Sequence, residues 1–144
     1  MPTASPPHRR ILLLENDEAV RRSLAMLLKI SDFEVRGYDR IASLIADPMI
    51  TQAEWLIAGD SVSDGTAIEA LAALRERGWF GRAALMTATH SVEFEHAARA
   101  CGYGTVLAKP ILQRELLHLL TDGDRMPIAA GIAAPRQSQP ASRV

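Results

Sequence analysis

The sequence predicts an α/β fold in which helices cover both faces of an open parallel β-sheet. Five short apolar runs recur along the chain, and each is a candidate for a buried strand. Each run is followed by a segment whose apolar residues recur every three or four positions, which is the spacing of one helix face. Parallel neighbours need a crossover connection, and five strand–helix units in about 110 residues provide one for every strand.

Strands and helices alternate from residue 11 onwards. Residues 11–14 form a continuous apolar run, as expected of a strand covered on both faces. Residues 18–30 carry one apolar helical stripe, and a strand nearer the sheet edge follows at 33–37, where apolar and charged residues alternate. A short helix over residues 40–46 stops before Pro48, because a residue that precedes proline disfavours the helical conformation.

The second half of the chain continues this alternation. Ser91 is placed to cap a helix, and Gly78 and Gly102 are placed to end helices. The expected strands are 55–58, 83–86 and 105–108, and the expected helices are 68–78, 92–101 and 112–120. The pattern therefore predicts one domain over residues 11–121.

Length and composition indicate a single globular domain and exclude several function classes. The chain has 144 residues, of which 48% are hydrophobic and 23% charged, and its net charge is −1. This charge gives no reason to expect nucleic acid or an anionic membrane as a partner. Cys101 is the only cysteine, and no segment resembles a signal peptide or a membrane span, so we expect a cytoplasmic protein. Residues 1–10 predict a flexible leader and residues 122–144 an Ala- and Pro-rich disordered tail.

Polar residues stand at the carboxyl ends of four of the predicted strands. They are Glu15, Asn16 and Asp17 after the first strand, Gly59 and Asp60 at the third, Thr87 at the fourth, and Lys109 and Pro110 at the fifth. Ligands of open α/β sheets bind outside the carboxyl ends of the strands, so these residues are expected to share one crevice. Clustered carboxylates there would hold Mg²⁺, and a lysine would offset phosphoryl charge. A hydroxyl could then bond a phosphoryl oxygen and draw its loop inward.

These motifs, in this order, resemble the receiver domain of bacterial two-component response regulators. The acidic turn is Glu15, Asn16 and Asp17, the switch threonine and its small neighbour are Thr87 and Ala88, and the lysine–proline pair, usually joined by a cis bond in this family, is Lys109 and Pro110. The resemblance implies a flavodoxin-like (βα)5 doubly wound parallel sheet with strand order 2-1-3-4-5. It also implies a role in phosphorelay signal transduction rather than an enzyme.

The chain departs from the family at the phosphoacceptor. Residues 56–66 align without gaps with receivers of the type LIADxxLxDGT, which puts Gly59 at the acceptor aspartate and Asp60 one residue later. Alternation along a strand turns Asp60 to the other face, and it could serve only if the strand ends in a bulge. We therefore expect a pseudo-receiver that works by phosphorylation-independent protein–protein interaction. The alternative is a phosphorylatable receiver that uses Asp60 with Mg²⁺.

Other positions of the expected pocket also differ from the family. The family usually has two aspartates where this chain has Glu15 and Asn16, so Mg²⁺ at Glu15, Asn16 and Asp60 would be weakly held. Thr105 stands where many receivers carry an aromatic switch residue. Lys109 could instead form a buried ion pair with Glu15 with no phosphoryl group present. Glu15 and Asp17 could also cap the helix that follows them.

Two further readings concern partners and chemistry. The segment 59–65 also resembles the nucleophile block of GDSL-type esterases, but the chain has no Asp-x-x-His pair to activate a serine.

Too few residues follow the fifth helix for a helix-turn-helix domain, so a stand-alone module is expected. The resemblance implies that a histidine kinase, a phosphotransferase, another regulator or a second copy binds at the face of the fourth helix, fifth strand and fifth helix. That face comprises Val92, Phe94, Glu95, His96, Arg99, Thr105, Val106, Leu107, Gln113, Arg114 and Leu117.

Overall fold

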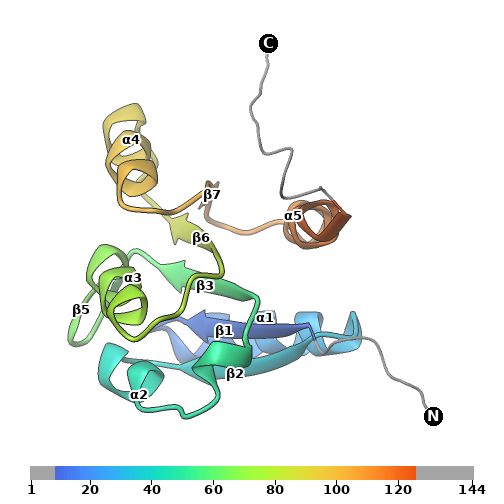
Figure 1. The fold of residues 1–144 in the computed structure, drawn as a ribbon. Helices are drawn as coiled ribbons and strands as arrows, with labels where there is room; N and C mark the ends of the chain where they lie inside the picture. The colour runs from blue at the N-terminus through green and yellow to red at the C-terminus, as the bar shows by residue number, and fades with distance from the viewer. Residues whose placement is uncertain (1–8, 126–144) are drawn as a thin grey trace. The chain divides into compact units, whose positions relative to one another are not determined.

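The computed structural model describes residues 9–125, which fall into two compact units (Figure 1). The first unit ends at Ile111 and contains the sheet and four α-helices. The second begins at Leu112 and contains helix α5 (Gln113–Arg125). Most of the predicted leader and tail lie outside the described residues, but Arg10 belongs to β1 and residues 122–125 belong to α5. Within residues 9–125, no helix has the length and apolar character needed to cross a bilayer.

A sheet of five parallel strands forms the centre of the first unit. Its order is β2-β1-β3-β6-β7, which is the predicted order 2-1-3-4-5 for the five strands taken along the chain. The strands are β1 (Arg10–Leu14), β2 (Glu34–Tyr38), β3 (Trp55–Gly59), β6 (Arg82–Thr87) and β7 (Thr105–Ala108). Each lies within two residues of its predicted range, and the flavodoxin-like prediction is confirmed.

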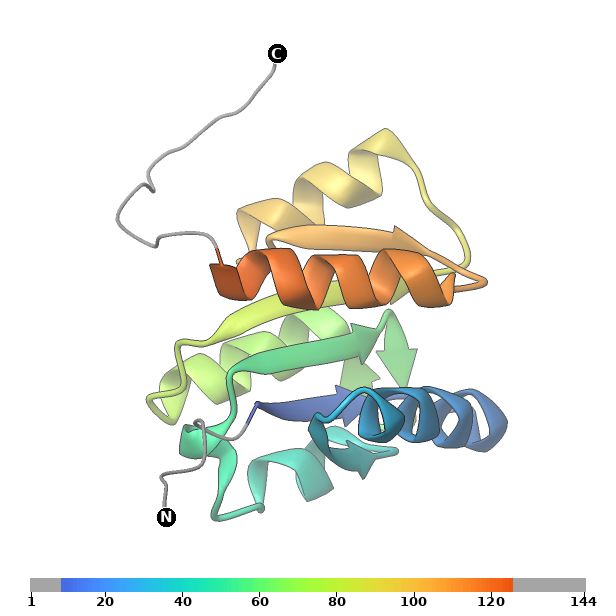
Figure 2. The same ribbon diagram turned by 90° about the vertical axis from the view of Figure 1, so that its right-hand side faces the viewer.

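Helices lie on both faces of this sheet. On one face, alternate strand residues such as Leu12 and Leu56 join a buried cluster with side chains from helices α2 (Ile41–Ile45), α3 (Ala67–Glu76) and α4 (Val92–Ala100). Helix α1 (Glu18–Ile30) lies on the opposite face, in front of the strands in Figure 2, with α3 behind them. Because both faces are covered, the central strands are apolar throughout, as their sequences predicted.

Two short segments between the main elements were not predicted. A 3-10 turn (Ile50–Gln52) precedes β3. A small antiparallel hairpin of β4 (Ser61–Val62) and β5 (Gly65–Thr66) follows β3, in the connection to α3. The two residues of its turn are Ser63 and Asp64, which are not one of the glycine-containing pairs that signal a hairpin in a sequence.

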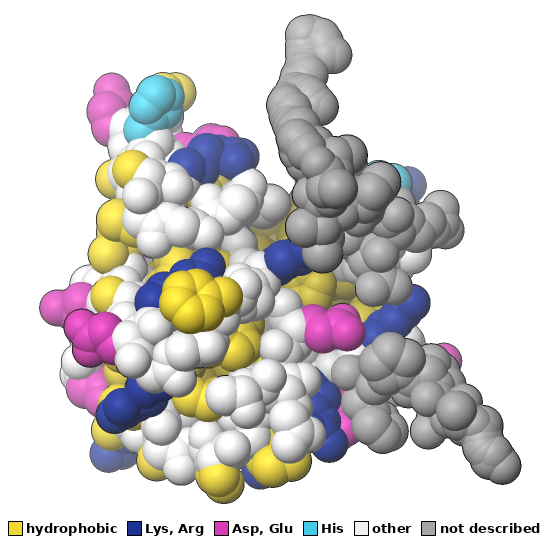
Figure 3. Space-filling view, in the orientation of Figure 1, with side chains coloured by type: hydrophobic (Ala, Val, Ile, Leu, Met, Phe, Trp, Pro, Cys, Tyr) yellow, Lys and Arg dark blue, Asp and Glu magenta, His cyan; other side chains and the backbone are white. Residues whose placement is uncertain are grey.

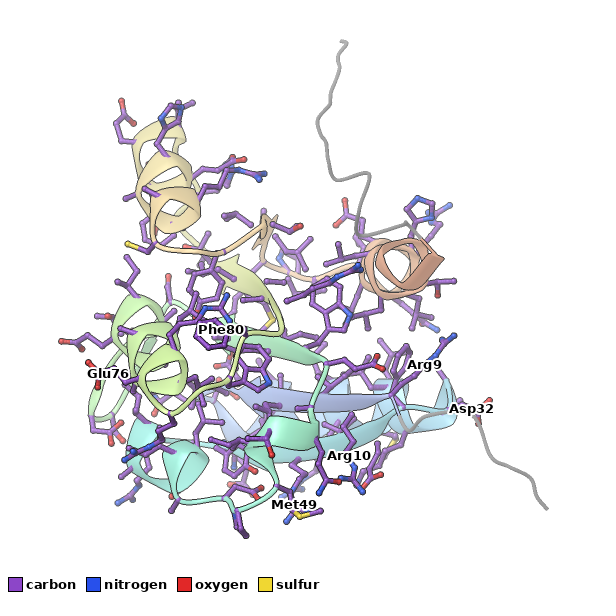
Figure 4. The ribbon with its side chains drawn as sticks, in the orientation of Figure 1. Arg9, Arg10, Asp32, Met49, Glu76 and Phe80 are labelled. Carbon is purple, nitrogen blue, oxygen red and sulfur yellow. The ribbon has the colours of Figure 1, made fainter. Side chains whose placement is uncertain are left out.

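At the amino ends of the strands, an arginine side chain packs against aromatic rings. The guanidinium of Arg75 lies 5.2 Å from the ring centre of Trp79 and 5.6 Å from that of Phe80, and Nη1 donates to the carbonyl oxygens of Trp79 and Gly81. Phe80 is an exposed side chain on the turn between α3 and β6 (Figure 4). On the face shown in Figure 3, hydrophobic and basic side chains lie next to each other. The polar residues predicted for the site lie at the opposite, carboxyl ends of the strands.

Candidate functional site

The carboxyl ends of β1, β3, β6 and β7 bring five predicted site residues together. We call Glu15, Gly59, Asp60, Thr87 and Lys109 the carboxylate centre. Neighbouring strands stay hydrogen-bonded to their carboxyl ends. The last pairs are Ala58 with Leu14, Gly59 with Met86 and Ala108 with Thr87. Aligned parallel strands therefore place side chains that are far apart in the sequence at one edge.

Glu15 is the buried anion of this centre. Its residue surface is only 3% exposed, and its carboxylate oxygens have different partners. Oε1 accepts the ammonium of Lys109 at 3.0 Å, and Oε2 accepts the backbone N–H of Asp17 at 2.9 Å. A buried carboxylate requires such partners, because an unpaired charge out of water is strongly unfavourable. The ion pair between Lys109 and Glu15 that the sequence allowed is present.

Gly59 leaves the space that the Glu15 carboxylate occupies. A Cβ atom built on Gly59 would lie 2.8 Å from Oε1 of Glu15 and 3.5 Å from its carboxyl carbon. The first distance is too short for a carbon and an oxygen that are not bonded. Any side chain at position 59 would thus point at this carboxylate, and the longer arm of Glu15 fits because position 59 has no side chain.

Asp60 lies just beyond the end of β3 and bonds the end of β6. Its Oδ2 accepts the hydroxyl of Thr87 at 2.8 Å. Pairing of β3 with β6 is continuous to Gly59 and the strand ends there without a bulge. Ala58 and Leu85 are paired and belong to one buried cluster, and Asp60 and Thr87 each lie two residues further along, so this contact agrees with alternation. That Asp60 could accept a phosphoryl group only at a bulge stays a prediction.

Thr87 and Lys109 link the last two strands of the sheet. The backbone N–H of Lys109 donates to the Thr87 carbonyl oxygen at 2.8 Å, and the Lys109–Pro110 bond is cis. Beside Lys109 opens a groove of about 570 Å³, lined by Ala88, Pro110, Ile111 and four residues of α1. Its lining makes the groove mostly apolar, with the lysine at one side. The Lys109 side chain is 25% exposed, so a small molecule can reach it although Glu15 is buried.

The arrangement of these residues does not fit a Mg²⁺ ion. Both oxygens of Glu15 are bonded within the protein, and one oxygen of Asp60 is bonded to Thr87. Asn16 is exposed. Among residues 9–125, no three His, Cys, Asp or Glu side chains are grouped as metal ligands. A hard cation needs several oxygens turned to one point, and here the oxygens turn to Lys109, Asp17 and Thr87.

The other predicted residues serve the surrounding backbone. Asp17 caps α1, because its Oδ1 accepts the N–H of Val20 at 3.0 Å. The N–H of Glu15 donates to the carbonyl oxygen of Tyr38 at 3.0 Å, which ties the acidic turn to β2. Thr105 starts β7 opposite Ala84, three residues before the strand end that faces Thr87. Of the two caps that the sequence allowed, Asp17 provides one directly.

A cluster at the end of β2 supports this turn. The Asp47 carboxylate accepts the Tyr38 hydroxyl, and its Oδ2 accepts Nε of Arg36 at 2.6 Å. Burial, and then the hydrogen bond to Asp47, raise the pKa of Tyr38 to about 12. Burial alone would raise the pKa of Asp47, but hydrogen bonds from Tyr38, the N–H of Met49 and Arg36 outweigh it and lower that pKa. Asp47 therefore stays an anion that holds the segment after α2 against β2.

The turn between β3 and α3 holds two helix ends. The Asp64 carboxylate accepts the backbone N–H groups of Ile41 at 2.7 Å and Ala42 at 3.0 Å, at the start of α2. These two bonds, Ile41 first, lower the pKa of Asp64. Thr66 caps α3 and forms a capping box with Glu69. Sequence reasoning missed Asp64, since its partners lie 22 and 23 residues away along the chain.

The surface of α4 differs from the expected one at its aromatic residue. Phe94, which the sequence placed in the binding face, packs against the buried cluster. Val92 is 67% exposed instead. Glu95 accepts Nε of Arg99 at 2.9 Å and contacts Nε2 of His90 at 2.8 Å, and these two partners, Arg99 first, lower its pKa. The remaining predicted residues of this face, Gln113, Arg114 and Leu117, lie on α5 in the second unit.

Comparison with known proteins shows which fold this is. No family model matches the chain, and no curated protein matches it by sequence. Among solved structures, a CheY-like response regulator receiver domain protein from Methanospirillum hungatei is similar, with 21% identity and a TM-score of 0.71, over 81% of this chain and 93% of that one. The chain has the receiver-domain fold.

Two further receiver structures are similar over nearly their full length. Chemotaxis protein CheY4 of Vibrio cholerae has 20% identity and a TM-score of 0.74, over 80% of this chain and 98% of that one. The BeF3-activated N-terminal receiver domain of Klebsiella pneumoniae RstA has 19% identity and the same score of 0.74, over 82% of this chain and 100% of that one. At these identities the likeness establishes the receiver fold, and the chemistry has to be argued from the carboxylate centre.

The segment that resembled an esterase nucleophile block has a structural place in this receiver fold. Residues 59–65 form the end of β3 and most of the β4–β5 hairpin. Asp64 of this block binds the start of α2, as described above. Its residues therefore account for a turn that holds helices together.

Proposed function

We propose that this chain is a response-regulator-type signalling protein that acts as a pseudo-receiver, by binding a protein partner without a phosphoryl cycle. The proposal combines the receiver fold with a centre that lacks an acceptor side chain on β3. Receiver domains of two-component systems act through other proteins. A receiver that is not phosphorylated at its centre is therefore left with protein binding as its function. No enzymatic step is assigned to the chain.

One observation carries this proposal. The Glu15 carboxylate lies 2.8 Å from the Cβ position of a side chain at residue 59, and it is paired with Lys109 at 3.0 Å. A phosphoryl group on residue 59 would need that space and that lysine. Since Gly59 has no nucleophile and Glu15 already neutralises Lys109, the centre supports neither the attack on phosphorus nor the stabilisation of the transferred charge.

The test is the intact mass of the protein after incubation with Mg²⁺ and acetyl phosphate. We expect no gain of a phosphoryl group by folded protein. A gain in the unsubstituted chain would contradict the pseudo-receiver proposal, and it would be assigned by repeating the incubation with Asp60→Ala. A known phosphorylatable receiver, incubated in the same tube, serves as the control for the phosphodonor.

A second candidate is a phosphorylatable receiver that uses Asp60. It is favoured by one contact, the 2.8 Å hydrogen bond from the Thr87 hydroxyl to Asp60 Oδ2, which puts a carboxylate beside a hydroxyl of the kind that would bond a phosphoryl oxygen. It predicts a mass gain that requires Mg²⁺ and is lost in Asp60→Ala. The two candidates therefore give opposite results in the same measurement.

For the binding surface we propose the exposed side of α4 and the edge strand β7. Val92 is exposed there, and Thr105, Val106 and Leu107 of β7 are half-buried on a strand with a neighbour on one side only. The proposed partner is a cytoplasmic histidine kinase, phosphotransferase or regulator, or a second copy of this chain. Val92→Asp should weaken binding of such a partner. Unchanged binding would mean that the binding surface does not include this side of α4.

A further inference from the structure

We infer that Asp60 and Glu15 are positioning residues that supply, from within the protein, the two contacts that a phosphoryl group would make with Thr87 and Lys109. The switch loop between β6 and α4 (residues 88–91) is then held in place by Asp60 without phosphate. This inference deepens the pseudo-receiver proposal and rests on it. It assigns a role to Asp60 that is not that of an acceptor.

The first contact is made through the Thr87 hydroxyl. Thr87 is fully buried, and its hydroxyl donates to Asp60 Oδ2 at 2.8 Å. The Thr87 hydroxyl oxygen also accepts a hydrogen bond from the backbone N–H of Thr89, at 3.1 Å. The hydroxyl thus connects a carboxylate after β3 to the first turn of the switch loop. A hydrogen bond to an ionised acceptor is stronger than one between neutral groups, which favours a charged residue at position 60.

The second contact is made through Lys109. Its ammonium binds Glu15 at 3.0 Å, and its backbone N–H binds the carbonyl oxygen of Thr87 at 2.8 Å. Thr87 is therefore held from both ends of the residue, by Asp60 on the hydroxyl and by Lys109 on the carbonyl. Asp60 thus bonds Thr87 directly, whereas Glu15 bonds the side chain of Lys109, whose backbone bonds Thr87.

The charges of the centre oppose an added oxyanion. Glu15 and Asp60 each bring a carboxylate, and the cation Lys109 is paired with Glu15. Arg21 donates to the backbone carbonyl oxygen of Glu15 at 2.8 Å. A phosphoryl mimic would have to displace Glu15 from Lys109 and approach Asp60, against repulsion from both carboxylates. The centre is thus satisfied as it stands.

The position of the switch loop is passed on to α4. Ser91 ends the loop and caps α4, accepting the N–H of Phe94 at 3.1 Å. His90 contacts Glu95, and the N–H of Glu95 binds the carbonyl oxygen of Ser91 at 2.9 Å. A loop fixed at Thr87 and Thr89 therefore fixes the start of α4, where Val92 is exposed. The proposed binding surface would be presented in one arrangement only.

The test is amide hydrogen exchange of the full chain, followed at Thr89 and in the first turn of α4. Removing the hydroxyl in Thr87→Val, or the carboxylate in Asp60→Ala, should speed exchange of the Thr89 amide by about tenfold, since local opening then costs one hydrogen bond less. Asp60→Asn keeps an acceptor oxygen and should restore most of the protection. Asp39→Ala is the matched control, because Asp39 follows β2 and contacts Arg40 instead of Thr87.

The outcomes separate this inference from the pseudo-receiver proposal. Faster exchange in Asp60→Ala, with exchange in the control unchanged and no slowing in the unsubstituted chain by BeF3 and Mg²⁺, supports the inference. Exchange in both Asp60→Ala and Thr87→Val within twofold of the unsubstituted chain overturns it, while the mass measurement still decides the proposed function. If Asp60→Ala fails to fold, Asp60→Ser, whose side chain is too short to reach the Thr87 hydroxyl, takes its place in the comparison with Asp60→Asn.

Discussion

The carboxylate centre and the turn between β3 and α3 adjoin at Asp60 and differ in what their side chains bond. In the centre, Glu15 and Asp60 bond the side chains of Lys109 and Thr87. In the turn, Asp64 and Thr66 bond backbone N–H groups at the starts of α2 and α3. The turn thus organises helices, whereas the centre organises a few polar side chains at one edge of the sheet.

This difference indicates which positions can be substituted without loss of the fold. Substitutions in the centre alter which side chains pair, and the sheet below them keeps its apolar contacts. Substitutions in the turn leave helix ends without partners.

Lys109→Met should have the largest effect on stability. It leaves Glu15, whose side chain is 4% exposed, without its cation. Breaking a fully buried pair costs about 3–5 kcal/mol, and we expect about 2 kcal/mol here because Lys109 is partly exposed. Urea unfolding measures the change. Lys29→Met is the matched control, since Lys29 is exposed on α1, and an equal loss in both variants would contradict the role of the ion pair.

Asp64→Ala should come next, with a loss that depends on pH. The pKa of Asp64 is held below its ordinary value of 3.8 by the N–H groups of Ile41 and Ala42, so its stabilisation is present above that pH and is lost as the pH falls through the lowered pKa. The urea midpoint of the variant should lie below that of the unsubstituted chain at pH 7 and approach it near the acid limit of folding. A pH-independent difference would count against the carboxylate.

Arg22→Ala should have the smallest effect and calibrates the others. Arg22 pairs with Glu18 one turn earlier on α1, and both side chains are mostly exposed. Exposed pairs at this spacing contribute about 0.3–0.5 kcal/mol, and salt screens them. A loss similar to that of Lys109→Met would mean that burial does not distinguish the two pairs.

The periodicity of the sequence was sufficient to predict the sheet and most helices, because each depends on local spacing of apolar residues. The hairpin at 61–66 was missed, since two-residue strands carry no periodic signal. The contact of Asp60 with Thr87 was not predicted, because it joins residues 27 positions apart in the sequence. The overlap of the Glu15 carboxylate with the place of a side chain at 59 depends on side-chain length across two strands, which one sequence does not reveal.

The central claim, that Glu15 occupies the place of a side chain at position 59, is tested most directly by a double-mutant cycle. The unfolding free energy is measured for Gly59→Ala, Glu15→Asp and the double variant, with Gly104→Ala as the control because a Cβ there meets nothing within 4 Å. We predict that Gly59→Ala costs about 1 kcal/mol alone and nothing when Glu15 is shortened to aspartate. Additive effects, within about 0.3 kcal/mol, would contradict the claim.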